Sequence, residues 1–266
     1  KFFRCRIEIN PRFFTFRSPK FVQMEMEFFC KDAESMDWYN YWRAERWNFY
    51  TERLGFPADQ LRIHDHDKLA HYAKAALDIE FAFPFGWGEI EGVHHRGTWD
   101  MSRHSEYSGK DLSYFDQEAN ERYLPTVVET SCGLDRIILA LLCKGYREDM
   151  ADTQKEDKDQ EVRVSLSLPP AVAPVQVAVL PLVKKLGDKA EAIYADLRRA
   201  FRCEYDLAGS IGKRYRRQDE IGTPFCVTVD FDTLEDQAVT VRDRDAMTQE
   251  RVSLDQIKSY LAGRIL

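Results

Sequence analysis

The chain has 266 residues, 44% of them hydrophobic, which is enough for one large or two ordinary domains with buried cores. Its net charge of −7 argues against nonspecific nucleic-acid binding over the whole surface but leaves room for a local basic patch. The six cysteines include no C-x-x-C pair, and no apolar run reaches the length of a membrane span, so neither a zinc site, a disulfide framework nor a membrane protein is indicated. We expect a soluble, cytoplasmic protein.

The first predicted element is a strand with two faces of different character. From residue 21 to residue 29, apolar side chains alternate with Gln23, Glu25 and Glu27, so the two sets point to opposite faces. Carboxylates that lie side by side repel each other and need a cationic partner. For these residues alone, the alternative is a half-buried strand with a solvated acidic face.

Arginines on the preceding segment favour a site over a solvated face. Asn10-Pro11-Arg12 is typical of a turn, so two strands would return on each other and carry both Arg6 and Arg17 on one hairpin. Guanidinium groups grip phosphate oxygens bidentately and stay charged. The hairpin therefore predicts a nucleotide site.

The following segments predict a mixed fold with many antiparallel strands. In chain order we expect a helix over 34–54, a strand near 61–63, a helix over 67–76, strands over 78–83 and 89–94 joined by a turn at 84–88, a strand over 123–130 and a helix over 134–142.

A charged and polar run over 147–161 is predicted to connect two domains, 1–160 and 161–266. Beyond it we expect strands over 175–180, 203–206, 225–229 and 238–242, and helices over 188–201, 211–219 and 254–261. This alternation is typical of a small α/β domain.

A second informative segment lies where the strand over 123–130 meets the next helix. The strand delivers Glu129 and Ser131 to its end, Gly133 allows close backbone approach, and Arg136 falls in the first helical turn. A helix N-terminus with a glycine and an arginine favours an anion. The alternative is a plain strand-to-helix turn capped by Ser131.

With these residues in place, the chain resembles the glycyl-tRNA synthetases, a subfamily of the class II aminoacyl-tRNA synthetases. The hairpin is similar to their motif 2, and Gly133-Leu134-Asp135-Arg136 is similar to their motif 3. Residues 86–92, His95-Arg96 and 71–74 also look like that subfamily, and the last hundred residues resemble an anticodon-binding domain. Because the chain lacks an initial Met and motif 1, we expect a fragment that runs from motif 2 to the C-terminus.

The resemblance implies an α+β fold, in which a class II synthetase-like antiparallel sheet with flanking helices is followed by a small α/β anticodon-binding domain. It implies that ATP is bound by Arg6, Ile7, Glu8, Phe16, Arg17, Ser18, Phe21, Glu89, Ile90, Gly133, Leu134, Asp135 and Arg136. Of these, Arg6 and Arg136 would be catalytic, and Arg4 is the alternative to Arg6 as the phosphate-binding arginine.

The resemblance further implies that glycine is surrounded by Phe21, Val22, Gln23, Met24, Glu25, Arg96, Glu129, Thr130, Ser131, Cys132 and Gly133. Elementary chemistry agrees, because carboxylates such as Glu25 and Glu129 suit the glycine ammonium and Arg96 suits its carboxylate. A crowded pocket of this kind excludes a larger side chain by clash.

The implied activity is that of a glycine–tRNA ligase, which activates glycine with ATP and transfers the glycyl group to the 3′ end of tRNA(Gly). ATP and Mg²⁺ would be the cofactors, the sequence does not assign the metal ligands, and the partner in assembly would be a second copy in a homodimer. One alternative is a non-catalytic synthetase-like accessory or regulatory subunit. Another is an ATP-dependent ligase on the same fold that uses a different amino acid or no tRNA.

Two further patterns fall outside these motifs. Lys213-Arg214-Tyr215-Arg216-Arg217 is a basic run with an interleaved aromatic, which suits either RNA phosphate contact with base stacking or a solvated helix face. His64-Asp65-His66-Asp67 is expected to be structural or superficial, because alternating residues near a strand end diverge. We expect the same of His94-His95.

Overall fold

The computed structural model describes residues 2–7, 10–150 and 162–265, with side chains from residue 10 to residue 149 and from 162 to 265. It divides into two compact units, Lys1–Cys143 and Lys144–Leu266. The predicted fold class, an antiparallel sheet with flanking helices followed by a smaller α/β unit, is confirmed. The predicted domain boundary between residues 160 and 161 lies outside the described residues.

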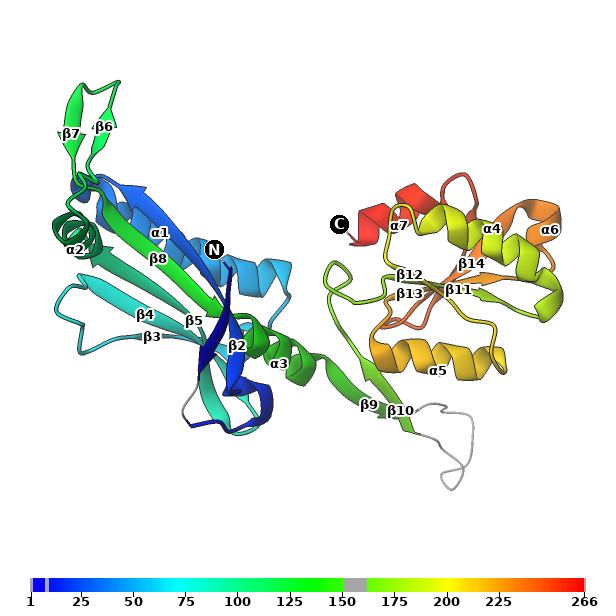
Figure 1. Cartoon of the computed structure of the whole chain (residues 1–266). Coiled ribbons are helices and arrows are strands. Elements are labelled where there is room, and N and C mark those ends of the chain that lie inside the picture. Colours follow the sequence, from blue (N-terminus) through cyan, green and yellow to red (C-terminus); the bar gives the residue numbers. More distant parts are fainter. Residues whose placement is uncertain (1, 8–9, 151–161, 266) are drawn as a thin grey trace. The chain divides into compact units, whose positions relative to one another are not determined.

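A six-stranded antiparallel sheet in the order β1-β2-β8-β5-β4-β3 forms the first unit (Figure 1). The strands are β1 (Phe2–Ile7), β2 (Lys20–Cys30), β3 (Leu61–Asp65), β4 (Ala75–Phe83), β5 (Gly86–Gly97) and β8 (Thr126–Gly133). The predicted hairpin is confirmed, since β1 pairs with β2 from Phe2 opposite Met24 to Ile7 opposite Lys20.

Helix α1 (Ser35–Asn48), continued by a π-helical turn over Phe49–Arg53, packs against β5 and β8. The ring of Phe28 on β2 lies 4.5 Å from that of Trp38 and 5.7 Å from that of Trp42, centroid to centroid. Aromatic side chains of α1 therefore pack on the apolar face of β2. The opposite face of β2 carries Gln23, Glu25 and Glu27.

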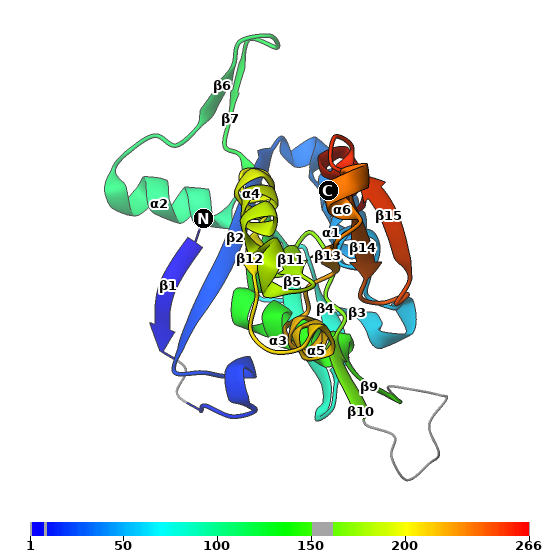
Figure 2. The ribbon, with the colours of Figure 1, turned by 90° about the vertical axis from the view of Figure 1, so that its right-hand side faces the viewer.

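The first unit also holds α2 (Trp99–Ser108), α3 (Leu134–Gly145) and a short hairpin of β6 (Tyr114–Asp116) and β7 (Glu121–Tyr123). The β6–β7 hairpin projects from the body of this unit in both views (Figures 1 and 2). The sequence predicted α3 but neither α2 nor this hairpin.

The helix predicted over 67–76 is wrong. Residues 67–74 form bends and turns instead of a helix, and β4 begins at Ala75. Two backbone hydrogen bonds explain the difference, because His66 N donates to Ala76 O at 3.0 Å and Lys74 N donates to His95 O at 2.9 Å. Pairing with neighbouring strands thus outweighs the helical preference of the alanines.

The second unit is built on a five-stranded sheet in the order β12-β11-β13-β14-β15. Its strands are β11 (Val177–Pro181), β12 (Cys203–Tyr205), β13 (Phe225–Val229), β14 (Ala238–Asp243) and β15 (Gln249–Ser253). Its helices are α4 (Gly187–Leu197), α5 (Ile211–Ile221), α6 (Thr233–Asp236) and α7 (Ile257–Ile265). Strands β12, β11 and β13 are parallel, and the remaining pairs are antiparallel.

Apolar residues of β11, β13 and β14 form the core of this unit with α4 and α7, while Ile211 and Tyr215 of α5 pack on the other face. The start of the predicted connection forms β9 (Tyr146–Met150), which pairs with β10 (Val162–Leu166). The rest of that connection, over 151–161, lies outside the described residues.

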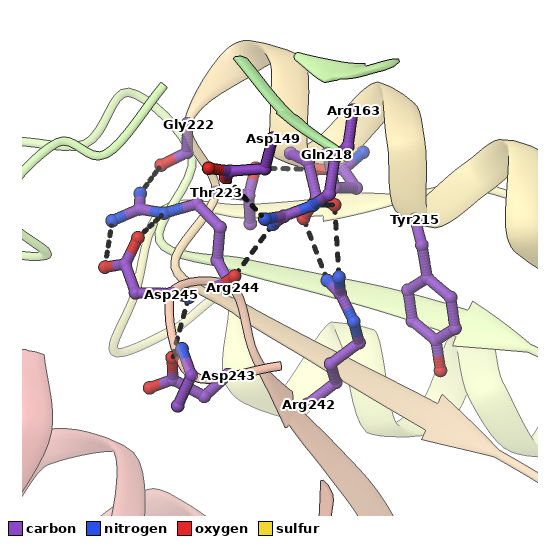
Figure 3. Close-up of polar contacts among 12 residues, drawn as sticks. Asp149, Arg163, Tyr215, Gln218, Gly222, Thr223, Arg242, Asp243, Arg244 and Asp245 are labelled. Carbon is purple, nitrogen blue, oxygen red and sulfur yellow. Dashed lines mark hydrogen bonds and ion pairs between the residues drawn. The ribbon is translucent and has the colours of Figure 1, made fainter. Parts of the chain in front are cut away.

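A buried ionic cluster ties β10 to the body of the second unit (Figure 3). The carboxylate of Asp219 on α5 accepts from Arg163 Nε at 2.8 Å and from Arg242 Nη1 at 2.8 Å. Arg163 also donates through Nη2 to the carbonyl of Arg244, at 2.8 Å. Asp219 is 2% exposed and the two arginines that share it are each 8% exposed, so two buried guanidinium groups share one buried carboxylate.

We expect Asp219→Asn to lower the free energy of unfolding by about 3–5 kcal/mol, because it removes the buried counter-charge that Arg163 and Arg242 share. Asp149→Asn is the matched control, since Asp149 lies 3.6 Å from Arg163 but its side chain is 53% exposed. Its effect should stay within about 1 kcal/mol. Urea unfolding of both variants measures the difference, and equal losses would contradict a dominant role for Asp219.

Candidate active site

Two neighbouring pockets lie on the polar side of the first sheet. The first is lined by Thr15, Phe16, Arg17, Phe21, Gln23, Glu89, Ser131, Cys132, Gly133, Asp135 and Arg136. The second is lined by Gln23, Glu25, Glu27, Glu89, His94, Arg96, Asp100, Met101, His104, Glu129 and Ser131. Because Gln23, Glu89 and Ser131 line both, the two pockets are contiguous.

The first pocket is organised around Arg136, in the first turn of α3. Its Nε donates to the Phe16 carbonyl at 3.2 Å and its Nη1 donates to the Glu89 carbonyl at 3.0 Å. The guanidinium also lies 4.4 Å from the centre of the Phe16 ring. A Cβ on Gly88 would lie 2.8 Å from that ring, so the glycine makes room for Phe16. These contacts fix a cation at one wall of the pocket.

Two polar contacts join the walls of this pocket. Asp135 at the start of α3 accepts a hydrogen bond from Val22 N at 2.8 Å, which connects the helix to β2. Gln23 Nε2 donates to Ser131 Oγ at 2.6 Å across β2 and β8. Strands β2 and β8 are far apart in the sequence, but their antiparallel pairing brings their polar residues side by side.

The second pocket is rich in carboxylates. Glu129 on β8 is paired with Arg96, whose Nη1 lies 3.1 Å from Glu129 Oε2, and with His94, whose Nδ1 lies 3.3 Å from Oε1. Arg96 also donates through Nε to Asp100 on α2 at 2.6 Å. Glu25 and Glu27 also line this pocket, which carries more acidic than basic side chains.

Two opposing effects set the pKa of Glu129. Burial raises the pKa, but the polar contact with His94 and the charge of Arg96 together outweigh burial and hold it below the ordinary value. Glu129 is therefore ionised at neutral pH. An ionised carboxylate in a pocket of this kind suits a cationic ligand.

A buried ion pair lies on the opposite face of the sheet, between β5 and α1. Glu91 on β5 is 1% exposed and accepts from Arg46 Nε at 2.5 Å and from Tyr50 Oη at 2.6 Å. Because Glu91 lies opposite Cys132 in the β5–β8 register, this ion pair stands behind the end of β8. Burial raises the pKa of the Cys132 thiol to about 12, so this cysteine is an unreactive thiol.

Most predicted site residues line a pocket. They are Phe16, Arg17, Phe21, Gln23, Glu25, Glu89, Arg96, Glu129, Ser131, Cys132, Gly133, Asp135 and Arg136. Those described residues that line neither pocket are Ser18, Val22, Met24, Ile90, Thr130 and Leu134. Strand alternation explains Val22, Met24 and Thr130, whose side chains belong to the face that α1 covers. The side chains of Arg4, Arg6 and Ile7, and the whole of Glu8, lie outside the described residues.

The sequence prediction missed the pocket residues from α2, namely Asp100, Met101 and His104. Asp100 and His104 are four residues apart, which is the spacing of one helical face, so recognising that helix would have found them. His94 was assigned a structural or surface role, yet it lines the second pocket.

The remaining candidate motifs have local partners. Arg214 in the basic run is buried, and its Nη1 donates to the Pro181 carbonyl at 2.6 Å, so the run does not form one solvated face. His66 Nε2 lies 2.9 Å from Asp78 Oδ2, and His64 Nδ1 lies 3.6 Å from Glu80 Oε1. Among the residues that the structure describes, no helix is long and apolar enough to cross a membrane.

Comparison with known proteins finds similar proteins for both units. Residues 176–264 match the family model of an anticodon binding domain. Over 97% of its length the chain is 52% identical to a glycine–tRNA ligase from Agathobacter rectalis, of which it covers 55%. A glycine–tRNA ligase from Streptomyces coelicolor is 53% identical over 98% of the chain and 58% of that protein. The chain spans about half the length of the curated relatives it matches, and it is homologous to them along nearly all of its own length.

The lowered pKa of Glu129 predicts an acid-dependent loss of stability. Since its folded-state pKa lies below the ordinary value of 4.5, the ionised group stabilises the fold above that pH, and the contribution is lost as the pH falls through the folded-state pKa. Between about pH 7 and about pH 3, the free energy of unfolding should therefore fall more for the wild type than for Glu129→Gln. Urea unfolding at several pH values measures this, and parallel curves would contradict it.

Proposed function

We propose that the protein is a glycine–tRNA ligase, and that the two contiguous pockets bind ATP and glycine. The observation that carries this proposal is the pairing of a pocket walled by Arg17 and Arg136 with a pocket dominated by carboxylates. Such a pair suits a polyphosphate beside an ammonium group. About 50% identity to proteins with this name supports the same assignment.

In this proposal the first pocket holds the nucleotide. Arg136 and Arg17 neutralise phosphate oxygens, and Phe21 at the start of β2 offers a ring for the base. Arg6, or alternatively Arg4, contributes the arginine of β1. Fixing these cations in advance is the main contribution that a protein makes to phosphate chemistry, because the reaction needs little covalent help.

The second pocket holds glycine. Glu129, ionised and held by two neighbours, is proposed to accept from the glycine ammonium together with Glu25. Arg96 lies beside them and is proposed to face the glycine carboxylate. Gln23 and Ser131, which line both pockets, would then stand where the two substrates meet.

The reaction follows from this placement. An oxygen of the glycine carboxylate attacks the α-phosphorus of ATP, the bond to the bridging oxygen breaks, and pyrophosphate leaves. A hydroxyl of the terminal tRNA ribose then attacks the glycyl carbonyl carbon, and AMP leaves. No protein nucleophile is needed, because orientation and charge neutralisation lower both barriers.

The donor set fits a magnesium ion that is bound mainly by phosphate. Mg²⁺ in nucleotide sites takes one or two carboxylates and keeps phosphate and water ligands. Glu89 is the carboxylate that lines both pockets, with its Oε2 3.2 Å from Arg136 Nη1. The described residues include no group of three acidic, histidine or cysteine side chains able to hold a metal alone. When bound, the ion would neutralise phosphate charge.

The remaining assignments concern partners. The match over residues 176–264 supports a tRNA as the partner of the second unit, and the names of the relatives favour tRNA(Gly). A homodimer and a cytoplasmic location belong to the same proposal. The alternative, a non-catalytic accessory subunit, is not favoured by any observation, since Arg136, Glu129 and Arg96 all lie at the pockets.

The proposal predicts glycine-dependent exchange between ATP and pyrophosphate by the full-length protein. In a panel of amino acids, glycine should support exchange and alanine and serine should not. Exchange with another amino acid but not with glycine would overturn the glycine assignment, and no exchange with any would favour the accessory subunit.

A substitution at Glu129 tests whether the two pockets bind different substrates. Glu129→Gln should raise the KM for glycine by about 10- to 150-fold, the equivalent of about 1.5–3 kcal/mol for a hydrogen bond to a charged group, and should leave the KM for ATP nearly unchanged. The same change at Glu118, in the exposed turn between β6 and β7, is the control. Equal losses for ATP and glycine would count against the role of Glu129.

A further inference from the structure

We propose that His94 is a positioning residue for glycine, which acts by holding the Glu129 carboxylate, and that Gly92 is the residue that allows it to do so. This inference rests on the proposed function, since it assigns the glycine pocket a further component. It starts from the strand register, in which His94 on β5 lies directly opposite Glu129 on β8, on the same face of the sheet.

The contact between the two side chains involves one specific nitrogen. His94 Nδ1 lies 3.3 Å from Glu129 Oε1 in an ion-pair contact, and this buried nitrogen makes no hydrogen bond to any described residue. Arg96 Nη1 donates to both oxygens of the same carboxylate, at 3.1 Å to Oε2 and at 3.3 Å to Oε1. Glu129 therefore has two cationic or polar neighbours, and Oε1 lies next to both of them.

Gly92 determines where the His94 ring can lie. A Cβ at residue 92 would meet His94 Cε1 at 2.5 Å and Nε2 at 2.8 Å, distances that real side chains do not reach. The imidazole thus lies across the bare backbone of Gly92. The His66 ring lies 6.4 Å from it, and His66 is in turn held by Asp78 at 2.9 Å.

The neighbouring His95 has a different environment from that of His94. His95 is 0% exposed, and its Nε2 lies 2.9 Å from Ser35 Oγ, on the face that α1 covers. His95 is therefore part of the packing. His94 faces the pocket, with its ring set by Gly92 and its Nδ1 directed at the carboxylate that we assign to the glycine ammonium.

The geometry predicts an asymmetric rescue. The amide nitrogen of asparagine sits at the same number of bonds from the backbone as Nδ1 of histidine, whereas that of glutamine corresponds to Nε2. In glycine-dependent exchange by the full-length protein, His94→Ala and His94→Gln should raise the KM for glycine by about tenfold, the equivalent of about 1.4 kcal/mol. His94→Asn should stay within about threefold of the wild type, and the KM for ATP should not change in any of them.

Gly92→Ala tests whether the position of the His94 ring depends on the absence of a side chain at residue 92. The added methyl should displace the His94 ring and raise the KM for glycine as much as His94→Ala does. The double variant Gly92→Ala/His94→Ala should have no higher KM for glycine than either single variant, because each single change removes the same contact between His94 and Glu129. Thermal unfolding of each variant shows whether it is folded. If Gly92→Ala does not fold, the three substitutions at His94 still decide the matter.

Each outcome bears on a defined claim. Rescue by asparagine but not by glutamine supports the positioning role. An asparagine variant as defective as the glutamine variant, or a normal KM for glycine in all of them, overturns it while glycine activation stands. Absence of glycine-dependent exchange in the wild type overturns both the proposed function and this inference.

Discussion

The alternation of side chains across the antiparallel sheet is the constraint on which the first unit depends. Each central strand gives one set of residues to α1 and the other to the polar face. On the covered face, Glu91 is buried, is neutralised by Arg46 at 2.5 Å and accepts a hydrogen bond from Tyr50 at 2.6 Å. On the other face, the same pleat places Gln23 beside Ser131. A one-residue slip in register would exchange the two sets and bury the site.

The charges on the polar face are sorted by position. Arg17 and Arg136 stand at the end where β2 meets α3, and carboxylates dominate further along β2 and β8. Cations beside a phosphate and carboxylates beside an ammonium each gain from being fixed before the substrates arrive, because little reorganisation remains at the moment of reaction. Glu129 illustrates the point, since its two neighbours keep it ionised despite its burial.

The sequence predicted the elements whose patterns are local. Alternation along β2 predicted Gln23 on the polar face, and the glycine at the β8–α3 junction drew attention to Arg136; both residues line the first pocket. Helix α2 was missed, and with it Asp100, because few of its residues follow an apolar period. The burial of Arg214 was also beyond prediction, since its acceptors are carbonyl groups that tertiary folding brings to it, such as that of Pro181. The same holds for the His94 ring, whose place depends on the register between β5 and β8.

The central claim is that one continuous site binds both the nucleotide and glycine. A stable glycyl-adenylate analogue tests it most directly, through its affinity for the full-length protein and the crystal structure of the complex. The account predicts binding far tighter than that of AMP or glycine alone, with the adenylate beside Arg136 and the glycyl ammonium beside Glu129. Binding no tighter than that of AMP, or a glycyl group directed away from Glu129, would contradict it.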